Sequence, residues 1–348
     1  MLVPNISDVA RRAGVSTATV SRYLRGVSVR SGDSIRTAIE ELGYHPSSVA
    51  QGLRLGVHYA IAVVVPDITN PFFAEVVRGV ESICRKGPYQ IILLNTDESS
   101  RDENEILRDI VQRVDGIILT PTTERQSSAE QLQRYYDAGT PIVLVDRVIP
   151  GKDFDCVLVD NKRGAILAAD HLVSLGHRRI ATIRGSMTTT PGRERFEAFS
   201  ERLSDVGIDL PPEYCRDGDF RESKAYQATL ELMALATPPT AIFSANNLMT
   251  AGALKALSAL RIRVPETVSI IGFDDLHLGE LLAAPLTCVT RDAVRQGALA
   301  ARMLLAQLDG NVERNPRTIV LDVSLLKRAS CRKVRPSDEH DEAFERSM

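Results

Sequence analysis

The feature that most constrains this chain is a long series of apolar runs, rich in Ile and Val, that alternate with helical stretches from Tyr59 onward. Polar residues do not alternate within these runs, so each strand must be covered on both faces. That requires a parallel sheet between layers of helices. Strands are expected at 60–65, 90–94, 116–119, 142–145, 156–159, 179–183, 240–243 and 268–273. Helices are expected near 72–86, 102–113, 127–137, 162–175, 193–206, 222–235, 247–260 and 293–308.

This pattern is too long for one comfortable core, since it runs for about 270 residues. It therefore predicts two α/β lobes with a break near Asp160, and late strands at 286–290 and 317–321 that complete sheets already begun. Open parallel sheets bind ligands at the carboxyl ends of their strands. The residues there are mostly polar: Asp67, Thr69, Asn70, Asn95, Thr96, Asp97, Thr120, Asp146, Arg147, Asp160, Asn161, Ser186, Asp219, Phe220, Ser244, Asn246, Asp274 and Asp275. Each could simply cap the helix that follows, but so many on one rim favour a cleft for a small polar molecule.

The N-terminal stretch NISDVARRAGVSTATVSRYL contains two short helical patterns that meet at Gly14. Glycine suits the left-handed turn that ends the first helix, and Ser16 suits the N-cap of the second. This is helix-turn-helix spacing, although the spacing alone also fits an ordinary helical hairpin. The second helix leaves short polar groups and arginine pointing away from the core, where they could enter a major groove: Ser16, Thr17, Ala18, Ser21, Arg22 and Arg25.

Charge is distributed unevenly between this N-terminal part and the rest. Residues 1–58 hold seven Arg, no Lys and four acids, a net charge of +3, whereas the remainder has 35 bases against 41 acids, a net charge of −6. A basic head on an acidic body suggests that one surface binds a polyanion.

Several classes of protein are excluded by what the sequence lacks. The first strand runs into PDITNPFF and not into GxGxxG, and no GxxxxGK[ST], HExxH or GxSxG motif occurs. The five cysteines are dispersed, which indicates reduced thiols and neither a disulfide framework nor a zinc site. No signal segment precedes the first helix, and the apolar runs are too short to span a bilayer. We therefore expect a cytoplasmic protein that is not an enzyme and carries no cofactor or metal.

The segments on either side of the body are less regular. A third helix is expected over Ser34–Leu42, closed by Gly43. After His45-Pro46, the stretch SSVAQGL could form one further turn of helix that is stable only when something holds it; a plain linker is the alternative. From Arg332 the tail is charged and aperiodic, which predicts disorder over 332–348.

The ordered combination of motifs resembles the lactose/galactose repressor family of bacterial transcription regulators. The resemblance runs from about Asn5 to Cys331 and includes ISDVARRAGVSTATVSRYL, IEELGYHPSSVAQGL, VVVPDITNPFFAEVVRGVE, RVDGIIL, VDR, LVSLGHRRIATIRG, SIIGFDDL and APLTCV. It implies a three-helix head (1–45), a hinge helix and linker (46–58), and a periplasmic-binding-protein-like body (59–331). Lobe 1 would comprise about 59–160 and 290–318, and lobe 2 about 161–289 and 319–331.

The resemblance also implies which residues contact DNA. Thr17 and Ala18 occupy positions that read operator bases, and Arg22 lies beside them. Val49 and Ala50 belong to the segment that matches a hinge helix in the minor groove, where Leu53 would wedge between central base pairs. The protein would bind a roughly palindromic operator as a homodimer, or as a tetramer.

The implied effector pocket combines forked donors, acceptors and a stacking face. Its positions are Phe72, Phe73, Asp146, Thr189, Arg195, Phe220, Asn246 and Asp274. Sugars and purines both suit this set, and a sugar or sugar acid is favoured because it is the family's commonest ligand class. Effector binding would switch operator affinity allosterically.

The sequence departs from the family pattern at three places. The span Leu24–Tyr44 is about three residues shorter than usual, Asn247 stands where the family has Asp, and Gly52 weakens the hinge. Two other classes, an exported solute-binding protein and a sugar-modifying enzyme, remain as alternatives. The first would have no use for residues 1–53, and the second would need a catalytic base.

Overall fold

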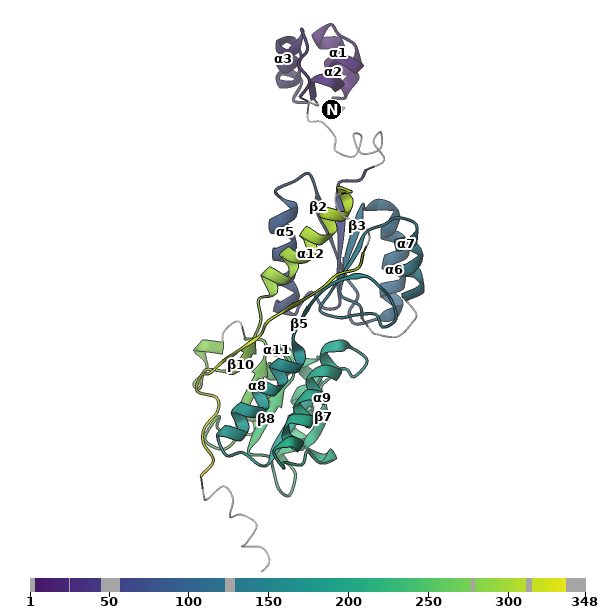
Figure 1. The fold of residues 1–348 in the computed structure, drawn as a ribbon. Coiled ribbons are helices and arrows are strands. Elements are labelled where there is room, and N and C mark those ends of the chain that lie inside the picture. The colour runs from purple at the N-terminus through teal and green to yellow at the C-terminus, as the bar shows by residue number, and fades with distance from the viewer. Residues whose placement is uncertain are drawn as a thin grey trace, which may run out of the picture. The chain divides into compact units, whose positions relative to one another are not determined.

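The computed structural model describes residues 4–24, 26–44, 57–122, 129–276, 279–310 and 315–335. The chain divides into two compact units, Met1–Tyr59 and Ala60–Met348 (Figure 1). Each unit has its own core.

The first unit is a three-helix head made of α1 (Ile6–Ala13), α2 (Thr17–Leu24) and α3 (Gly32–Leu42). Asn5 begins α1 with a capping box, because its side chain accepts from the backbone of Asp8 while the Asp8 carboxylate accepts from the Asn5 N–H. Gly14 ends α1 in the left-handed region, at φ 65°. Small apolar side chains form the core: Val9, Ala10, Val20, Ile35 and Ala38.

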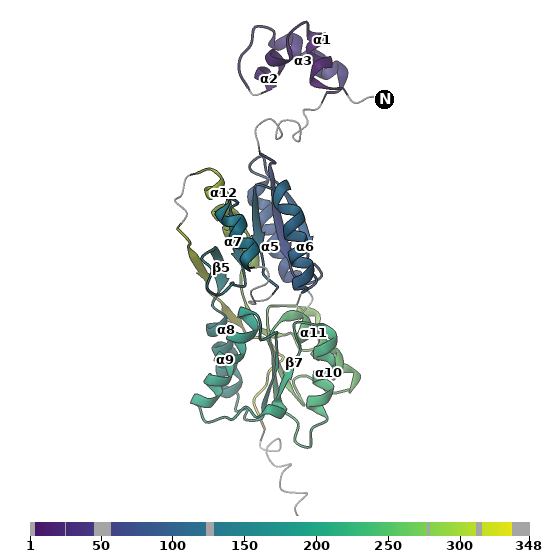
Figure 2. The same cartoon turned by 90° about the vertical axis from the view of Figure 1, so that its right-hand side faces the viewer.

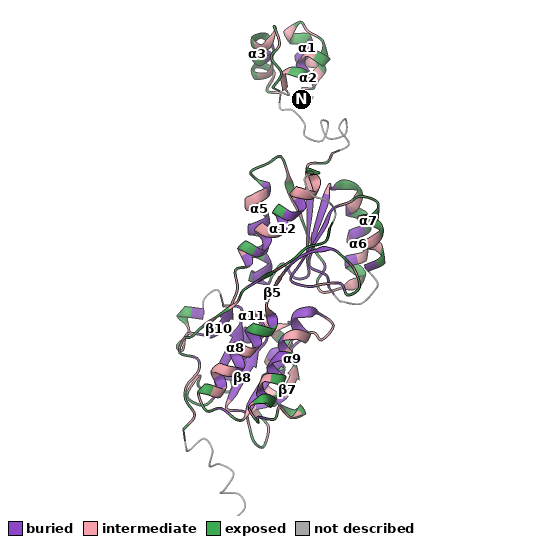
Figure 3. Ribbon diagram, viewed as in Figure 1, coloured by how far each residue is buried: buried purple, intermediate pink, exposed green. Residues whose placement is uncertain are grey.

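The first lobe of the body is a six-stranded sheet with helices on both faces. Its strand order is β11-β5-β4-β3-β1-β2 and every pairing is parallel. The strands are β1 (Ala60–Val65), β2 (Gln90–Asn95), β3 (Gly116–Leu119), β4 (Ile142–Val145), β5 (Asp155–Val159) and β11 (Thr318–Leu321). The helices are α5 (Pro71–Cys84), α6 (Ser100–Ile110), η1 (Val111–Arg113), α7 (Ala129–Asp137) and α12 (Ala293–Leu308). α5 and α12 share one apolar cluster with the sheet, and α6 and α7 share the other, so β1, β3 and β4 are buried on both faces (Figure 3).

The second lobe repeats this plan with the strand order β12-β10-β9-β8-β6-β7. Its strands are β6 (Ile180–Arg184), β7 (Cys215–Asp217), β8 (Ala241–Ser244), β9 (Ser269–Phe273), β10 (Thr287–Thr290) and β12 (Ser324–Leu326). Its helices are α8 (Asn161–Ser174), α9 (Thr190–Asp205), η2 (Pro212–Tyr214), α10 (Glu222–Met233), α11 (Asn247–Ala259) and η3 (Gly279–Leu281). α8 and α9 cover one face and α10 and α11 the other (Figure 2).

Two helices of the first lobe cross at backbone contact. A Cβ placed on Gly297 of α12 would lie 2.0 Å from the carbonyl oxygen of Val76 in α5, and one on Gly79 of α5 would lie 2.0 Å from that of Val294. Only glycine permits this approach, which holds the start of α12 against the middle of α5.

The structure corrects the sequence predictions at the edges of the sheets. β7 and β12 were not predicted; each has only three residues, and β12 runs antiparallel to β10. β11 pairs with β5 over its whole length, so the chain leaves the first lobe after Leu321 and not after residue 318. The predicted disorder is wrong for 332–335, because Arg332 donates to Ser269 Oγ at 3.1 Å and Val334 donates to the carbonyl of Leu175 at 2.9 Å.

No helix in the described ranges is long and apolar enough to cross a membrane. Nor do the described residues contain a group of three or more His, Cys, Asp or Glu side chains that could hold a metal ion.

Candidate effector cleft

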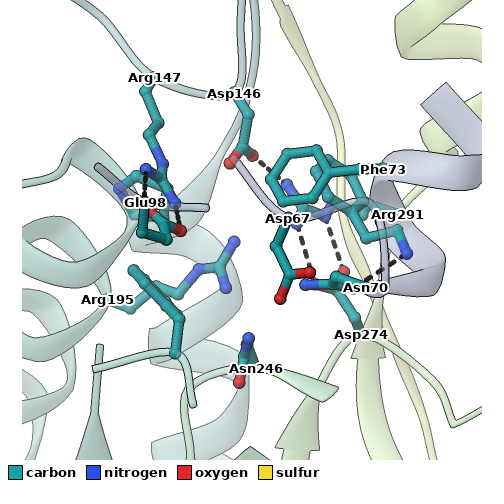
Figure 4. Close-up of a pocket in the computed structure, with 13 residues that line it drawn as sticks. Asp67, Asn70, Phe73, Glu98, Asp146, Arg147, Arg195, Asn246, Asp274 and Arg291 are labelled. Atoms are coloured by element: carbon teal, nitrogen blue, oxygen red, sulfur yellow. Dashed lines mark hydrogen bonds and ion pairs between the residues drawn. The ribbon is translucent and has the colours of Figure 1, made fainter. Parts of the chain in front are cut away.

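The carboxyl ends of the strands of both lobes meet in one cleft (Figure 4). Its lining is polar, with three phenylalanine rings among charged groups: Asp67, Asn70, Phe72, Phe73, Glu98, Asp146, Arg147, Pro191, Arg195, Phe220, Asn246, Asp274 and Arg291. The chain crosses between the lobes at three places beside this cleft, after β5, after β10 and after β11. A ligand here would therefore contact both lobes and the connections between them.

Asp146 and Asp274 occupy equivalent positions in the two lobes. Each follows a buried strand, has φ 67°, and donates its N–H to the neighbouring strand, Asp146 to Val157 O at 3.0 Å and Asp274 to Val289 O at 2.8 Å. A non-glycine residue held in the left-handed region costs about 1 kcal/mol or more, and such residues cluster at functional sites. The two carboxylates are thus placed from opposite sides of the cleft by matching backbone geometry.

The guanidinium of Arg291 lies between these two carboxylates. It donates to both oxygens of Asp274, at 2.7 Å from Nε and 2.9 Å from Nη2, and from Nη1 to Asp146. Its Cζ atom is 3.6 Å from the centroid of the Phe72 ring. Burial alone would raise the pKa of Asp146, but the positive charges of Arg291 and Arg195 outweigh it and hold that pKa below its usual value.

Arg195 is the most deeply buried cation of the cleft, with 1% of its surface exposed. Its Nε donates to Asn161 Oδ1 at 2.9 Å and its Nη1 to the carbonyl of Ala245 at 2.7 Å, while Cζ stacks 3.4 Å above the Phe273 ring. Nη2 is buried and has no hydrogen-bond partner among the described residues. Burial, and secondly the charge of Arg291, lower the pKa of Arg195 to about 9. Nη2 of Arg195 can therefore donate a hydrogen bond to an oxygen atom of a bound ligand.

Arg147 is held away from the two aspartates by a carboxylate of its own. Glu98, which has φ 56°, receives two hydrogen bonds from the Arg147 guanidinium at 2.8 and 2.7 Å. Nη1 of Arg147 also donates to the carbonyls of Pro121 and Thr122. This bidentate pair fixes one wall of the cleft.

Hydrogen bonds outside the cleft centre join the two lobes directly. Asn247 Nδ2 donates to Asn70 Oδ1 at 2.9 Å, and at the mouth Arg221 donates to the Asp97 carboxylate at 3.1 Å. The cavity enclosed by the lining residues at the cleft centre has a volume of about 20 Å³, little more than one water molecule occupies, and larger voids of about 300 and 380 Å³ adjoin it on the side of Arg291 and on the side of Arg221. The lobes are therefore closed on one another.

The head presents its predicted reading surface to solvent. Ser16, Thr17, Ala18 and Arg22 are exposed and Ser21 is half-buried. The Ser16 hydroxyl accepts from the backbone of Thr19 at 3.2 Å, as an N-cap should. The predicted hinge residues Val49, Ala50 and Leu53, and Arg25, lie outside the described residues.

Comparison with known proteins identifies the family. Residues 5–47 match the family model "Bacterial regulatory proteins, lacI family", and residues 169–331 match "Periplasmic binding protein-like domain". The ribose operon repressor of Escherichia coli (strain K12) is 35% identical over 307 residues, which cover 87% of this chain and 92% of the relative. The chain belongs to the lacI family. The HTH-type transcriptional repressor PurR of Pasteurella multocida is also similar, at 32% identity over 312 residues, covering 88% of this chain and 93% of that one.

Solved structures of lacI-family proteins share the fold. A family member from Enterococcus faecium with bound ribose is 30% identical, has a TM-score of 0.71 and covers 79% of this chain and 100% of its own. The lac repressor dimer bound to operator and the anti-inducer ONPF is 25% identical, has a TM-score of 0.84 and covers 95% and 100%. The predicted fold class, a helix-turn-helix head and a two-lobed α/β body, is confirmed. The protein is a DNA-binding transcriptional regulator and not an enzyme.

Seven of the eight effector residues predicted for this lacI-family protein line the cleft, and Thr189 does not. Its hydroxyl caps α9, accepting from the N–H of Gly192 at 3.3 Å and donating to the carbonyl of Ser186 at 2.8 Å. Asn247, which stands where the family has Asp, donates from Nδ2 to Asn70 Oδ1 and so bridges the lobes.

Arg291, Glu98 and Pro191 were missed. Arg291 directly follows β10. The expectation that ligands bind at the carboxyl ends of parallel strands, extended to the late strands, would have included it. Pro191 is in the first turn of α9, and Glu98 lies three residues after the end of β2, where a helix cap was an equally good interpretation.

Proposed function

We propose that this lacI-family regulator represses transcription as a homodimer in the cytoplasm and that a neutral pentose of the ribose type, bound in the cleft, controls its operator affinity. The observation that carries the proposal is the pair of carboxylates, Asp146 and Asp274, that face each other from the two lobes. Vicinal hydroxyls of a sugar donate to carboxylates, and its ring face packs on an aromatic side chain. Phe72, Phe73 and Phe220 supply such faces beside the carboxylates.

The relatives support the ligand class. One is named a ribose operon repressor and a solved structure of similar fold contains ribose. Arg195 Nη2 adds an unpartnered donor, which suits a ring or hydroxyl oxygen. A bound sugar would take hydrogen bonds from both lobes, so its binding energy would depend on their relative position, which is the condition for allosteric control.

DNA binding is assigned to the head and the segment that follows it. Thr17 and Ala18 read base edges, and Arg22 contacts a base or phosphate. Leu53, with Val49 and Ala50, inserts into the minor groove from a hinge helix. The head of each protomer contacts one half-site of a palindromic operator. The net charge of +3 over residues 1–58 favours contact with phosphates.

The test is a binding screen of the full-length protein by calorimetry against ribose, other pentoses, hexoses, aldonic acids and purine bases. A pentose should bind, and Asp274→Asn should weaken its binding about 10- to 100-fold, because a charged acceptor in a buried hydrogen bond is lost. Asp97→Asn, at the exposed mouth, is the matched control and should change the affinity little. Binding of a purine but no sugar would contradict the proposed ligand, and unchanged affinity in Asp274→Asn would contradict the proposed site.

A further inference from the structure

We propose that Arg291 is a built-in competitor of the effector, a side chain that occupies the sugar site in the free protein and must move before a sugar can bind. This rests on the proposed function, because it concerns how the same cleft is filled and emptied. In this role Arg291 sets the affinity and specificity of the cleft for its effector. It also couples the entry of the effector to the closure of the lobes.

The first argument is that Arg291 makes the contacts a sugar would make. Its guanidinium lies 3.6 Å from the face of Phe72, as a pyranose or furanose ring lies on an aromatic face. It donates to both oxygens of Asp274 and to Asp146, which are the acceptors available to vicinal hydroxyls. Stacking face and acceptors are therefore in use, and Figure 4 shows Arg291 beside Asp146 and Asp274.

The second argument is space. The cavity enclosed between the two carboxylates is only about 20 Å³, which holds one water molecule and not a pentose, whereas a neighbouring void of about 300 Å³ is lined in part by Phe72, Asp274 and Arg291. The side chain that fills the cleft centre is that of Arg291. Arg291 stands in the connection between β10 and α12, whereas Arg195 is anchored to Asn161 and Ala245 by its own lobe. Withdrawal of Arg291 would free both carboxylates at once.

The third argument is that Arg291 joins the lobes. Asp146 belongs to the first lobe and Asp274 to the second, and the side chains of all three are at least nine-tenths buried. With Arg291 between them the carboxylates attract a common cation; without it, two buried carboxylates would face one another and repel. A ligand-free protein is thus held closed by its own arginine, and a sugar must replace that interaction.

The consequence for affinity follows from mass action. Apparent affinity is reduced by the fraction of molecules in which the site is available. Replacing the competitor with a side chain that cannot bridge the carboxylates should raise that fraction, so sugar binding should become tighter. If Arg291 were instead an ordinary ligand contact, the same replacement would make binding weaker. The two possibilities predict changes of opposite sign.

The experiment measures ribose affinity by calorimetry in the full-length protein and in Arg291→Gln. Binding should tighten by at least tenfold, or become measurable if it is not so in the unmodified protein. Arg221→Gln is the matched control, since it removes another inter-lobe guanidinium bridge, to Asp97, without freeing an acceptor in the cleft. It should change the ribose affinity by no more than about fivefold, as expected for an exposed ion pair.

A second measurement tests competition itself. In Arg291→Ala the space vacated by the guanidinium is open, so added methylguanidinium, at concentrations far below those that unfold proteins, should occupy it. The apparent ribose Kd of Arg291→Ala should rise in proportion to the methylguanidinium concentration, while that of the unmodified protein should not respond. A purely structural role for Arg291 would produce no such competition.

Weaker ribose binding by Arg291→Gln would overturn the inference, as would equal tightening by Arg221→Gln or the absence of methylguanidinium competition. In each of these cases ribose still binds, so the proposed function stands. If neither ribose nor any other sugar binds to the protein or to Arg291→Gln, the proposed function fails and the inference with it.

Discussion

Replacement of Arg195 by methionine separates the structural role of this cation from its role toward a ligand. Methionine keeps the unbranched stem but ends about where Nε of arginine lies, so an apolar, adaptable side chain fills part of the volume beside Phe273. The variant loses the hydrogen bonds to Asn161 Oδ1 and Ala245 O and the stacking on Phe273. It also loses Nη2, the donor that has no partner among the described residues.

The expected effect on stability is modest for so buried a residue. Two hydrogen bonds from a charged donor are worth about 1.5–3 kcal/mol each. The variant also gains stability, because it no longer buries a cation. Burial and the charge of Arg291 lower the pKa of that cation to about 9. These opposing contributions leave a net loss of about 1–3 kcal/mol in the free energy of unfolding, measurable by urea titration.

The expected effect on effector binding is larger. Loss of a charge-assisted hydrogen bond to a buried ligand oxygen costs about 1.5–3 kcal/mol, or roughly 10- to 150-fold in Kd. Arg202→Met, on the same helix, is the control: it breaks a half-exposed pair with Asp170 at 2.6 Å and should leave ligand affinity unchanged. Ligand affinity that is equal in Arg195→Met and the unmodified protein would refute the assignment of Arg195 to the effector.

Three further predictions concern stability. The pKa of Asp146 is lowered in the folded state, so its ionised form stabilises the protein above pH 3.8, the ordinary pKa of the group, and this stability is lost as the pH falls below that value. Between pH 5 and pH 3, the free energy of unfolding in urea should therefore fall less for Asp146→Asn than for the unmodified protein. Equal losses in the two proteins would refute this. Gly297→Ala should destabilise the body by about 2 kcal/mol or more in urea, because its Cβ would meet Val76 O at 2.0 Å. Gly87→Ala should not, because its Cβ would lie 3.8 Å from the nearest atom, the carbonyl oxygen of Cys84. Asn5→Ala removes a capping box and should cost the head about 1 kcal/mol, seen as a lower melting temperature of a head fragment; no change would contradict the cap.

The extent to which the sequence predicted the fold varies between its centre and its edges. Central strands such as β3 and β4 are continuous apolar runs, so their composition alone predicts that both of their faces are buried. β7 and β12 were not predicted because edge strands of three residues carry little hydrophobic pattern: Cys215–Asp217 is largely polar, and Ser324–Leu326 is too short to show an alternation. Their pairing is decided by the neighbouring strand, which a local pattern does not contain.

The site shows a similar division. Residues at strand ends, such as Asp146, Asn246 and Asp274, could be placed together because parallel strands bring their carboxyl ends to one edge. What could not be foreseen is how they pair. Which of three arginines bridges the two aspartates depends on how far each side chain reaches across the lobes. The position of Thr189 was equally compatible with lining the cleft and with capping α9, which is the role it has.

The central claim is that a sugar bound in the cleft changes the affinity of the head for DNA. The most direct measurement starts from DNA sequences selected by the full-length protein from a random pool. Binding to the selected duplex is then followed by fluorescence anisotropy at fixed salt, with and without a saturating concentration of the sugar that binds the cleft. The account predicts inverted half-sites in the selected DNA and a change in Kd of about fivefold to 150-fold on addition of the sugar. Selected DNA that binds with the same Kd in the presence and absence of that sugar would contradict it.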